Sequence, residues 1–224
     1  MYNKVKLTKR QIKEDKFTTF MLSSKQQVLE NWQYIVMGVI VVVLVVVAVV
    51  YYLDSRATRT LESGLNYNRA VQEYRNGQNQ VAIASLSQIL EKYSGESVEG
   101  QATFMLGKVN YELRNYVEAI RYYEMYLAKF KDRPFVRCAA LAGVGAAYEN
   151  QASFLQAADA FARAYEEDPE SPLAGDYLAA VVRNYLQLGD IDKAKVHLDL
   201  LEKDFGDTDV ARRAVRLFSE KTQG

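Results

Sequence analysis

Residues 141–169 read LAGVGAAYENQASFLQAADAFARAYEEDP, and the order of small, aromatic and polar residues in them specifies a local structure. Apolar residues recur every three or four positions in two blocks separated by a short polar break, which is the periodicity of two amphipathic helices. Gly145 and Ala157 are small enough for two antiparallel helices to approach closely, and the rings of Tyr148 and Phe161 would fill the space beside them. The stretch predicts a helical hairpin.

The same pattern recurs along the chain at nearly constant intervals of 37, 38 and 37 residues. Each copy has an Ala followed four positions later by an aromatic residue or Leu, at Ala82/Leu86, Ala119/Tyr123, Ala157/Phe161 and Ala194/Leu198. Residues 208–220 look like a closing half-repeat. Internal self-similarity at a fixed period predicts stacked helix pairs, each burying its neighbour's apolar side.

These copies resemble the tetratricopeptide-repeat (TPR) signature, W-x2-L-G-x2-Y followed by A-x3-F-x2-A and P, with Leu141 in place of Trp. The resemblance implies an all-α fold, a TPR-like α-solenoid of about four helix pairs plus a closing helix. The positions that match the signature are Leu106, Gly107, Ala119, Tyr123, Leu141, Gly145, Tyr148, Ala157, Phe161, Ala164, Pro169, Tyr185, Ala194 and Leu198.

The TPR register also implies a partner-binding surface on the concave side, formed by the first helix of each pair. It would present Gln101, Phe104, Lys108, Tyr111, Ala139, Ala142, Ala146, Glu149, Asp176, Ala179, Arg183 and Leu186. The Lys/Asn set with which chaperone-binding TPR domains hold a C-terminal carboxylate is missing. An Ala-lined floor flanked by Lys108, Glu149 and Arg183 would instead admit a helix or an extended segment. Alternatively, this face packs on the chain's own terminal helix or on a second copy.

Residues 35–53 read IVMGVIVVVLVVVAVVYYL, a run without one charged residue. As a helix it would span about 30 Å, the thickness of a bilayer's hydrocarbon core. Aromatic residues lie at both ends, where their rings favour the headgroup level. The run is longer than the apolar part of a signal peptide and a long polar stretch precedes it. We therefore predict a transmembrane anchor over 34–53, followed by the solenoid over 54–224.

The distribution of charge sets the expected orientation. Residues 1–34 carry a net charge of +4 and the rest of the chain −4, which favours a cytoplasmic N-terminus and a translocated C-terminal domain. Residues 1–33 are expected to form a basic amphipathic helix. It would lie on the cytoplasmic leaflet or dock on another membrane protein.

Composition argues against several classes of function. The chain has one His and one Cys, so neither a His-based triad nor a metal-ligand cluster is expected, and no cofactor motif is present. Gly143 and Gly145 lie inside a predicted helix, where helix packing explains them better than a dinucleotide loop does. His197 and Cys138 are expected to be packing residues. The acidic C-terminal part disfavours nucleic acid as a partner. We predict neither an enzyme nor a metal or cofactor site.

The junctions between repeats are longer than usual and resemble those of bacterial envelope TPR proteins of the BamD and Tol-Pal coordinator types. The order of basic tail, single span and TPR domain resembles the YfgM family of ancillary SecYEG translocon subunits. These resemblances imply an inner-membrane protein with a periplasmic TPR domain, whose partners are translocon, chaperone or envelope-assembly proteins. The expected function is a membrane-tethered adaptor linked to secretion. Alternatives are a self-associating envelope organiser, linked to division or to Tol-Pal, and a receptor facing the cytoplasm.

Overall fold

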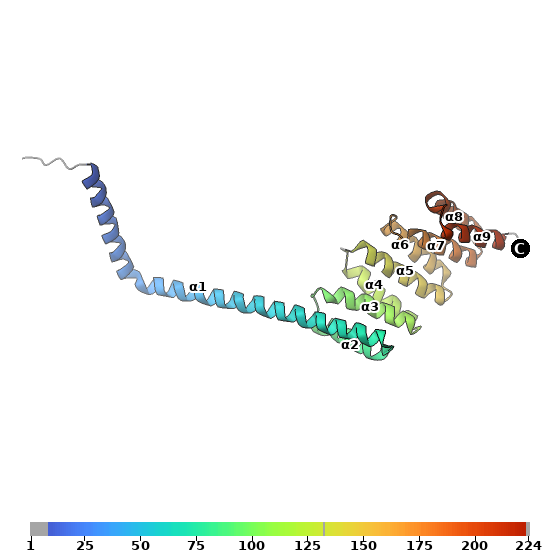
Figure 1. Cartoon of the computed structure of the whole chain (residues 1–224), viewed down its shortest axis with the longest axis horizontal. Coiled ribbons are helices and arrows are strands. Elements are labelled where there is room, and N and C mark those ends of the chain that lie inside the picture. The colour runs from blue at the N-terminus through green and yellow to red at the C-terminus, as the bar shows by residue number, and fades with distance from the viewer. Residues whose placement is uncertain (1–8, 132, 223–224) are drawn as a thin grey trace, which may run out of the picture. The chain divides into compact units, whose positions relative to one another are not determined.

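The computed structural model describes residues 9–131 and 133–222, and within them the backbone forms nine helices and no strand (Figure 1). The chain divides into two compact units, Met1–Thr58 and Arg59–Gly224, and the first helix contributes to both. The helices are α1 (Lys9–Arg75), α2 (Asn79–Lys92), α3 (Val98–Glu112), α4 (Tyr116–Lys129), α5 (Pro134–Asn150), α6 (Phe154–Glu167), α7 (Ala174–Leu188), α8 (Ile191–Phe205) and α9 (Asp209–Thr222).

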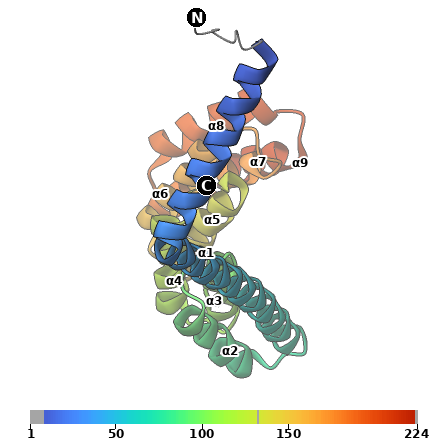
Figure 2. The ribbon, with the colours of Figure 1, turned by 90° about the vertical axis from the view of Figure 1, so that its left-hand side faces the viewer.

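The second unit is a stack of helix pairs (Figure 2). The C-terminal part of α1 pairs with α2, α3 with α4, α5 with α6 and α7 with α8, and α9 closes the stack by packing on α7 and α8. The four repeating alanines, Ala82, Ala119, Ala157 and Ala194, have no exposed surface. The predicted fold is confirmed: in chain order, an apolar N-terminal helix is followed by a solenoid of four helix pairs and a closing helix.

The first unit consists of the N-terminal part of α1. The stretch Trp32–Arg75 contains a window of mean hydropathy 3.1, with none of that window buried. It is long and apolar enough to cross a membrane, a property that a signal sequence near an N-terminus shares. The side chains that would make residues 1–33 amphipathic lie, with few exceptions, outside the described residues. Helix α1 has no break at 54, where the solenoid was predicted to begin.

The turn inside each helix pair repeats the same geometry. One residue per turn has a left-handed backbone: Gly77 (φ 75°), Arg114 (φ 61°), Ala152 (φ 56°) and Gly189 (φ 74°). In each turn the next residue donates its N–H to a carbonyl five positions back, as Ser153 does to Tyr148 at 2.9 Å. This hydrogen bond satisfies a carbonyl at the helix end that would otherwise have no partner. Two of the four turns therefore hold a side-chain-bearing residue in a conformation that favours glycine.

Replacing Ala152 with Gly is expected to raise the free energy of unfolding by about 1 kcal/mol. The left-handed conformation costs an L-residue roughly 1–2 kcal/mol, which exceeds the entropic cost of introducing Gly. Thermal unfolding of the full-length protein in detergent measures the change as a rise in Tm. Ala157→Gly, in a regular helical position of α6, is the control and should lower Tm. A lower Tm for Ala152→Gly would contradict the strain at this turn.

Candidate functional site

The residues predicted to face a partner lie on α3, α5 and α7, the first helices of the second, third and fourth pairs. We call this surface the first-helix face, and it consists of Gln101, Phe104, Lys108, Tyr111, Ala139, Ala142, Ala146, Glu149, Asp176, Ala179 and Arg183. Gln101, Lys108 and Asp176 are exposed and the other eight are half-buried. Leu186, which the register also assigned to this face, is buried in the core against α8 and α9.

At the C-terminal ends of the first helices, polar side chains bind one another. The hydroxyl of Tyr74 in α1 donates to Glu112 of α3 at 2.5 Å, and the amide of Asn150 in α5 donates to the hydroxyl of Tyr111 at 3.1 Å. The ammonium of Lys108 lies over the Tyr74 ring, 5.2 Å from its centroid. These contacts join the first helices of neighbouring pairs, α1 to α3 and α3 to α5.

Glu149 and Arg183, predicted to flank a ligand, bind each other instead. The guanidinium of Arg183 donates to both carboxylate oxygens of Glu149, at 2.6 and 2.9 Å, and Asn184 adds a third bond at 3.3 Å. Hydrogen bonding to Glu149 raises the pKa of Arg183. The pair joins α5 to α7. A charged ligand would have to break this bidentate pair before either residue could bind it.

At the other end of the first-helix face lies a cavity of about 530 Å³. Four aromatic rings line it: Tyr67 from α1, Phe104 from α3, and Tyr126 and Phe130 from the end of α4. Phe104 meets Tyr126 edge-on with ring centroids 5.9 Å apart, and Tyr126 stacks on Phe130 at 5.2 Å. We call this space the aromatic cavity, and its remaining lining comes from Gly95, Glu96, Ser97, Gly100, Gln101, Arg133 and Val136.

The aromatic cavity therefore includes Phe104 and Gln101 among the residues predicted for partner binding. The repeat register did not point to Phe130, Arg133 or the segment 95–97, because they belong to the junctions between helix pairs. The extra length of those junctions, visible in the sequence, was the available signal. The volume of the aromatic cavity lies within the roughly 300–1,000 Å³ typical of sites that enclose a ligand group.

Most residues of the repeat signature lie in the core that supports this face, whereas Pro169 is exposed. A Cβ added to Gly107 would lie 2.7 Å from the ring of Tyr123, and one added to Gly145 would lie 2.9 Å from the ring of Phe161. Tyr123 is 4% exposed, and burial raises the pKa of its hydroxyl. Eight residues of the repeat signature have 4% exposure or less: Leu106, Ala119, Tyr123, Leu141, Ala157, Ala164, Ala194 and Leu198.

A second regularity escaped the sequence reasoning. In three helix pairs, opposite charges 30 residues apart join the first helix to the end of the second, namely Glu62/Lys92 at 2.6 Å, Glu99/Lys129 at 2.5 Å and Arg137/Glu167 at 2.6 Å. The polarity is reversed in the third pair. The constant spacing of opposite charges was the signal that could have found these links.

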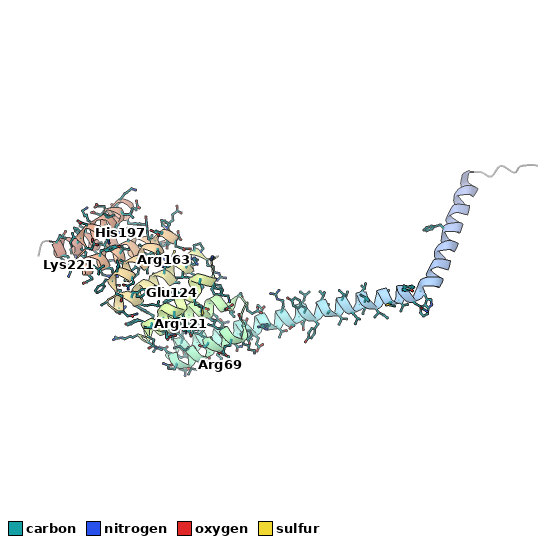
Figure 3. All side chains as sticks on the ribbon, turned by 180° about the vertical axis from the view of Figure 1, so that it is seen from behind. Arg69, Arg121, Glu124, Arg163, His197 and Lys221 are labelled. Carbon is teal, nitrogen blue, oxygen red and sulfur yellow. The ribbon has the colours of Figure 1, made fainter. Side chains whose placement is uncertain are left out.

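The second helices of the pairs carry a different kind of surface. Figure 3 labels Arg121 and Glu124 of α4 and Arg163 of α6, all of which are exposed. Arg121 pairs with Glu118 at 2.7 Å within its own helix. Arg163 lies 3.9 Å from Asp159 of its own helix. Exposed pairs within one helix are the ordinary feature of a solvated helix surface.

Residues capable of binding a metal ion do not gather in the described ranges. Among residues 9–131 and 133–222, no three His, Cys, Asp or Glu side chains are arranged to hold a metal ion. Cys138 is fully buried, and burial raises the pKa of its thiol, which keeps it protonated at neutral pH.

His197 of α8, labelled in Figure 3, contacts the neighbouring helix α7. Its imidazole stacks on the ring of Tyr185 from α7, with centroids 5.6 Å apart and planes 10° apart. Burial lowers the pKa of His197, against a smaller opposing effect of Glu166. The neutral imidazole is therefore the form that the folded protein favours.

This lowered pKa predicts that acid weakens the solenoid through His197. The unfolded chain binds a proton with the ordinary His pKa near 6.5, so below that pH it holds more protons than the folded chain. The contribution of the neutral His197 ring to the free energy of unfolding is fully present above pH 6.5. It is lost as the pH falls through the pKa that His197 has in the folded protein. Because the chain has one His, His197→Gln should flatten the dependence of Tm on pH between 7.5 and 5. Equal slopes for the two proteins would contradict the burial of the neutral ring.

The helix pairs stack into an α-solenoid, their first helices form one face, and the aromatic cavity lies at one end of that face. These features define a scaffold of the kind that binds proteins. The family model described as a tetratricopeptide repeat-like domain matches residues 25–183, well over half of the chain. The chain belongs to this family. The match begins before the apolar run and so includes the apolar part of α1.

Solved structures with the same fold support the assignment. The apo form of RapI superposes with a TM-score of 0.61 at 16% identity, covering 72% of this chain and 64% of RapI. A tetratricopeptide repeat protein from Parabacteroides merdae ATCC 43184 gives a TM-score of 0.61 at 16% identity, covering 72% of this chain and 60% of that one. Aspartyl phosphate phosphatase F from Bacillus subtilis gives 0.59 at 20% identity, with coverages of 74% and 46%.

The chain thus spans less than two thirds of each of these three proteins, and identities this low indicate a common fold alone. No curated protein matches the chain by sequence similarity. Proteins of this class bind other proteins, and the class is generally not enzymatic.

Proposed function

We propose that this protein is a membrane-tethered adaptor, whose solenoid binds proteins beside the outer face of the bacterial inner membrane. The aromatic cavity carries the proposal, because apolar rings at an open end of the first-helix face are a surface that a partner's side chains can fill. The apolar stretch of α1 supports the tether, since all of its large side chains from Val39 to Leu53 are at least half exposed. Water would not stabilise such a helix, whereas a bilayer would.

The link to secretion or envelope protein biogenesis rests on the architecture that the chain has in common with YfgM-type translocon subunits and on its lengthened, BamD-like repeat junctions. In this role the partners are translocon subunits, envelope chaperones or assembly factors. Tethering raises the local concentration of a weak partner near its site of emergence, which suits a modest cavity.

Cysteine labelling in intact cells tests the location. A cysteine at Val117, a position 71% exposed on α4, should react with a membrane-impermeant maleimide added from outside, after permeabilisation of any outer membrane. A cysteine at Phe20 should react only once the inner membrane is opened. The buried Cys138 supplies little background. The reverse pattern would contradict the proposed orientation, and unchanged export of envelope proteins after deletion of 59–224 would contradict the proposed role.

One observation favours the second candidate, a self-associating organiser of the envelope. Leu61 and Leu65 of α1 are 66% and 61% exposed. They lie 37 residues before Val98 and Ala102, which are buried between the first and second helix pairs. A second copy could cover them. A cysteine at Leu61 should then give a disulfide-linked dimer in native membranes, and a monomer under oxidising conditions would count against this function.

A further inference from the structure

Two acidic side chains that the structure describes beside the aromatic cavity, Glu96 and Glu99, are already neutralised by the protein. Glu96 binds the guanidinium of Arg59 at 3.2 Å. Glu99 binds the ammonium of Lys129 at 2.5 Å and accepts the backbone N–H of Gly95 at 2.8 Å. Neither carboxylate is left to attract a cationic group from a partner.

Arg133 differs from these residues. It is exposed on the cavity lining, and within the part of the chain that the structure describes its side chain has no ion pair or hydrogen bond. It immediately precedes α5, which begins at Pro134, so the positive end of that helix dipole adds to its charge. The stretch KDR at 131–133 is net positive by sequence. The unmatched charge at the cavity is therefore cationic.

The walls and the rim together define a ligand chemistry. Four aromatic rings and Val136 form an apolar space that favours a large apolar side chain, and aromatic pairs gain further from edge-on or offset contacts. The rings could also attract a cation, but the unpaired charge of Arg133 opposes one. A carboxylate next to the apolar anchor would meet the planar guanidinium, which binds carboxylates through two hydrogen bonds.

We propose that the aromatic cavity takes a Phe, Trp or Leu side chain from a partner segment in which a neighbouring residue is Asp or Glu, and that Arg133 binds this carboxylate. The inference rests on the proposed adaptor function and specifies the sequence preference of its site. The partner recognised is a protein segment of acidic and apolar composition.

Selection from a random dodecapeptide display library tests the preference. The bait is the full-length protein in phosphatidylcholine nanodiscs, with empty nanodiscs for counter-selection. The wild-type protein should enrich peptides that pair a large apolar residue with an adjacent Asp or Glu. Arg133→Glu should enrich Lys or Arg at that adjacent position instead. For the best wild-type peptide, replacing its acidic residue by the amide should weaken binding about tenfold in fluorescence anisotropy.

Two tryptophan substitutions at equivalent register positions control for location. Gln101→Trp fills the cavity entrance from an exposed position and should abolish selection. Asp176→Trp occupies the corresponding exposed position on α7, away from the cavity, and should leave selection unchanged. Circular dichroism with Tm confirms that each variant folds.

The inference is overturned if the wild-type protein selects no motif above empty nanodiscs, if the motif is indifferent to Arg133→Glu, or if both tryptophan variants behave alike. Such results leave the adaptor function open to its own tests, because cysteine labelling in cells and the export assay do not depend on this sequence preference.

Discussion

Replacing Arg137 with Ala is expected to lower the free energy of unfolding of the solenoid by about 3 kcal/mol, the largest effect of any single side chain outside the apolar core. The guanidinium, from α5, donates to both oxygens of Glu167 at the end of α6, at 2.6 and 3.2 Å. It also donates to the carbonyls of Leu127 and Phe130 at the end of α4, at 2.8 and 2.9 Å. The side chains of Arg137 and Glu167 are only 17% and 24% exposed.

The loss is large because Arg137 binds two helix ends at once. Carbonyls at the end of α4 have no helical partner, and Glu167 would be left unpaired in a mostly buried position. In a domain of this size, about 3 kcal/mol corresponds to a fall in Tm of roughly 6–12 °C.

Thermal unfolding of the full-length protein in detergent measures the fall, with Arg137→Lys and Arg121→Ala as comparisons. Lys keeps the charge without the fork of donors and should recover part of the stability. Arg121 pairs with Glu118 on an exposed helix surface, so its loss should cost under about 0.5 kcal/mol. Equal effects of Arg137→Ala and Arg121→Ala would contradict the role of Arg137.

Replacing Gly143 with Ala is expected to destabilise the solenoid by about 2 kcal/mol, although Ala favours helices over Gly by about 1 kcal/mol. The new Cβ would lie 2.5 Å from the ring of Tyr123, which real carbon atoms do not tolerate. The ring cannot move away, because Gly107 approaches its other side so closely that a Cβ there would lie 2.7 Å from it. Tyr123 is held between the backbones of α3 and α5.

Gly64→Ala is the matched control. Gly64 also lies inside a helix, and a Cβ added there would meet no atom within 4 Å. This substitution should raise stability by about 0.5–1 kcal/mol through helix propensity alone. Combining Gly143→Ala with Tyr123→Leu should cost less than the sum of the two single changes. Additive effects, or a stabilising Gly143→Ala, would mean that Tyr123 is not confined in this way.

The helix pairs could be predicted from sequence because each repeat carries its own local pattern. The alanines at 82, 119, 157 and 194 report the close approach of two helices, and all four are fully buried. Tyr123 and Phe161 lie against glycines of the neighbouring helix, as small and large residues at these spacings suggested. Short-range periodicity contains this information, since the contacts within a pair recur in every copy.

The contacts between neighbouring helix pairs were harder to predict from the sequence. Glu149 and Arg183, expected to flank a ligand, are 34 residues apart and bind each other across α5 and α7. The placement of one helix pair on the next, which brings them together, is not contained in the pattern of a single repeat. The aromatic cavity combines Tyr67 of α1 and Phe104 of α3 with Phe130, the residue that follows α4, and depends on junction segments that break the repeat.

The backbone conformation at the turns could not be predicted from the sequence either. Gly77 and Gly189 fit their left-handed positions, but Arg114 and Ala152 occupy the same positions without the usual residue type. The tertiary structure imposes the turn there against local preference, so only the alignment of all four repeats reveals the shared geometry.

Photo-crosslinking in intact cells tests most directly whether the solenoid binds proteins through the aromatic cavity. A photoreactive residue at Gln101, on the cavity lining, should give crosslinks to translocon, chaperone or client proteins. The same residue at Val117, exposed on α4, should give few or none. Crosslinks of equal strength from both positions, or products from Gln101 that contain only a second copy of the chain, would contradict the adaptor function.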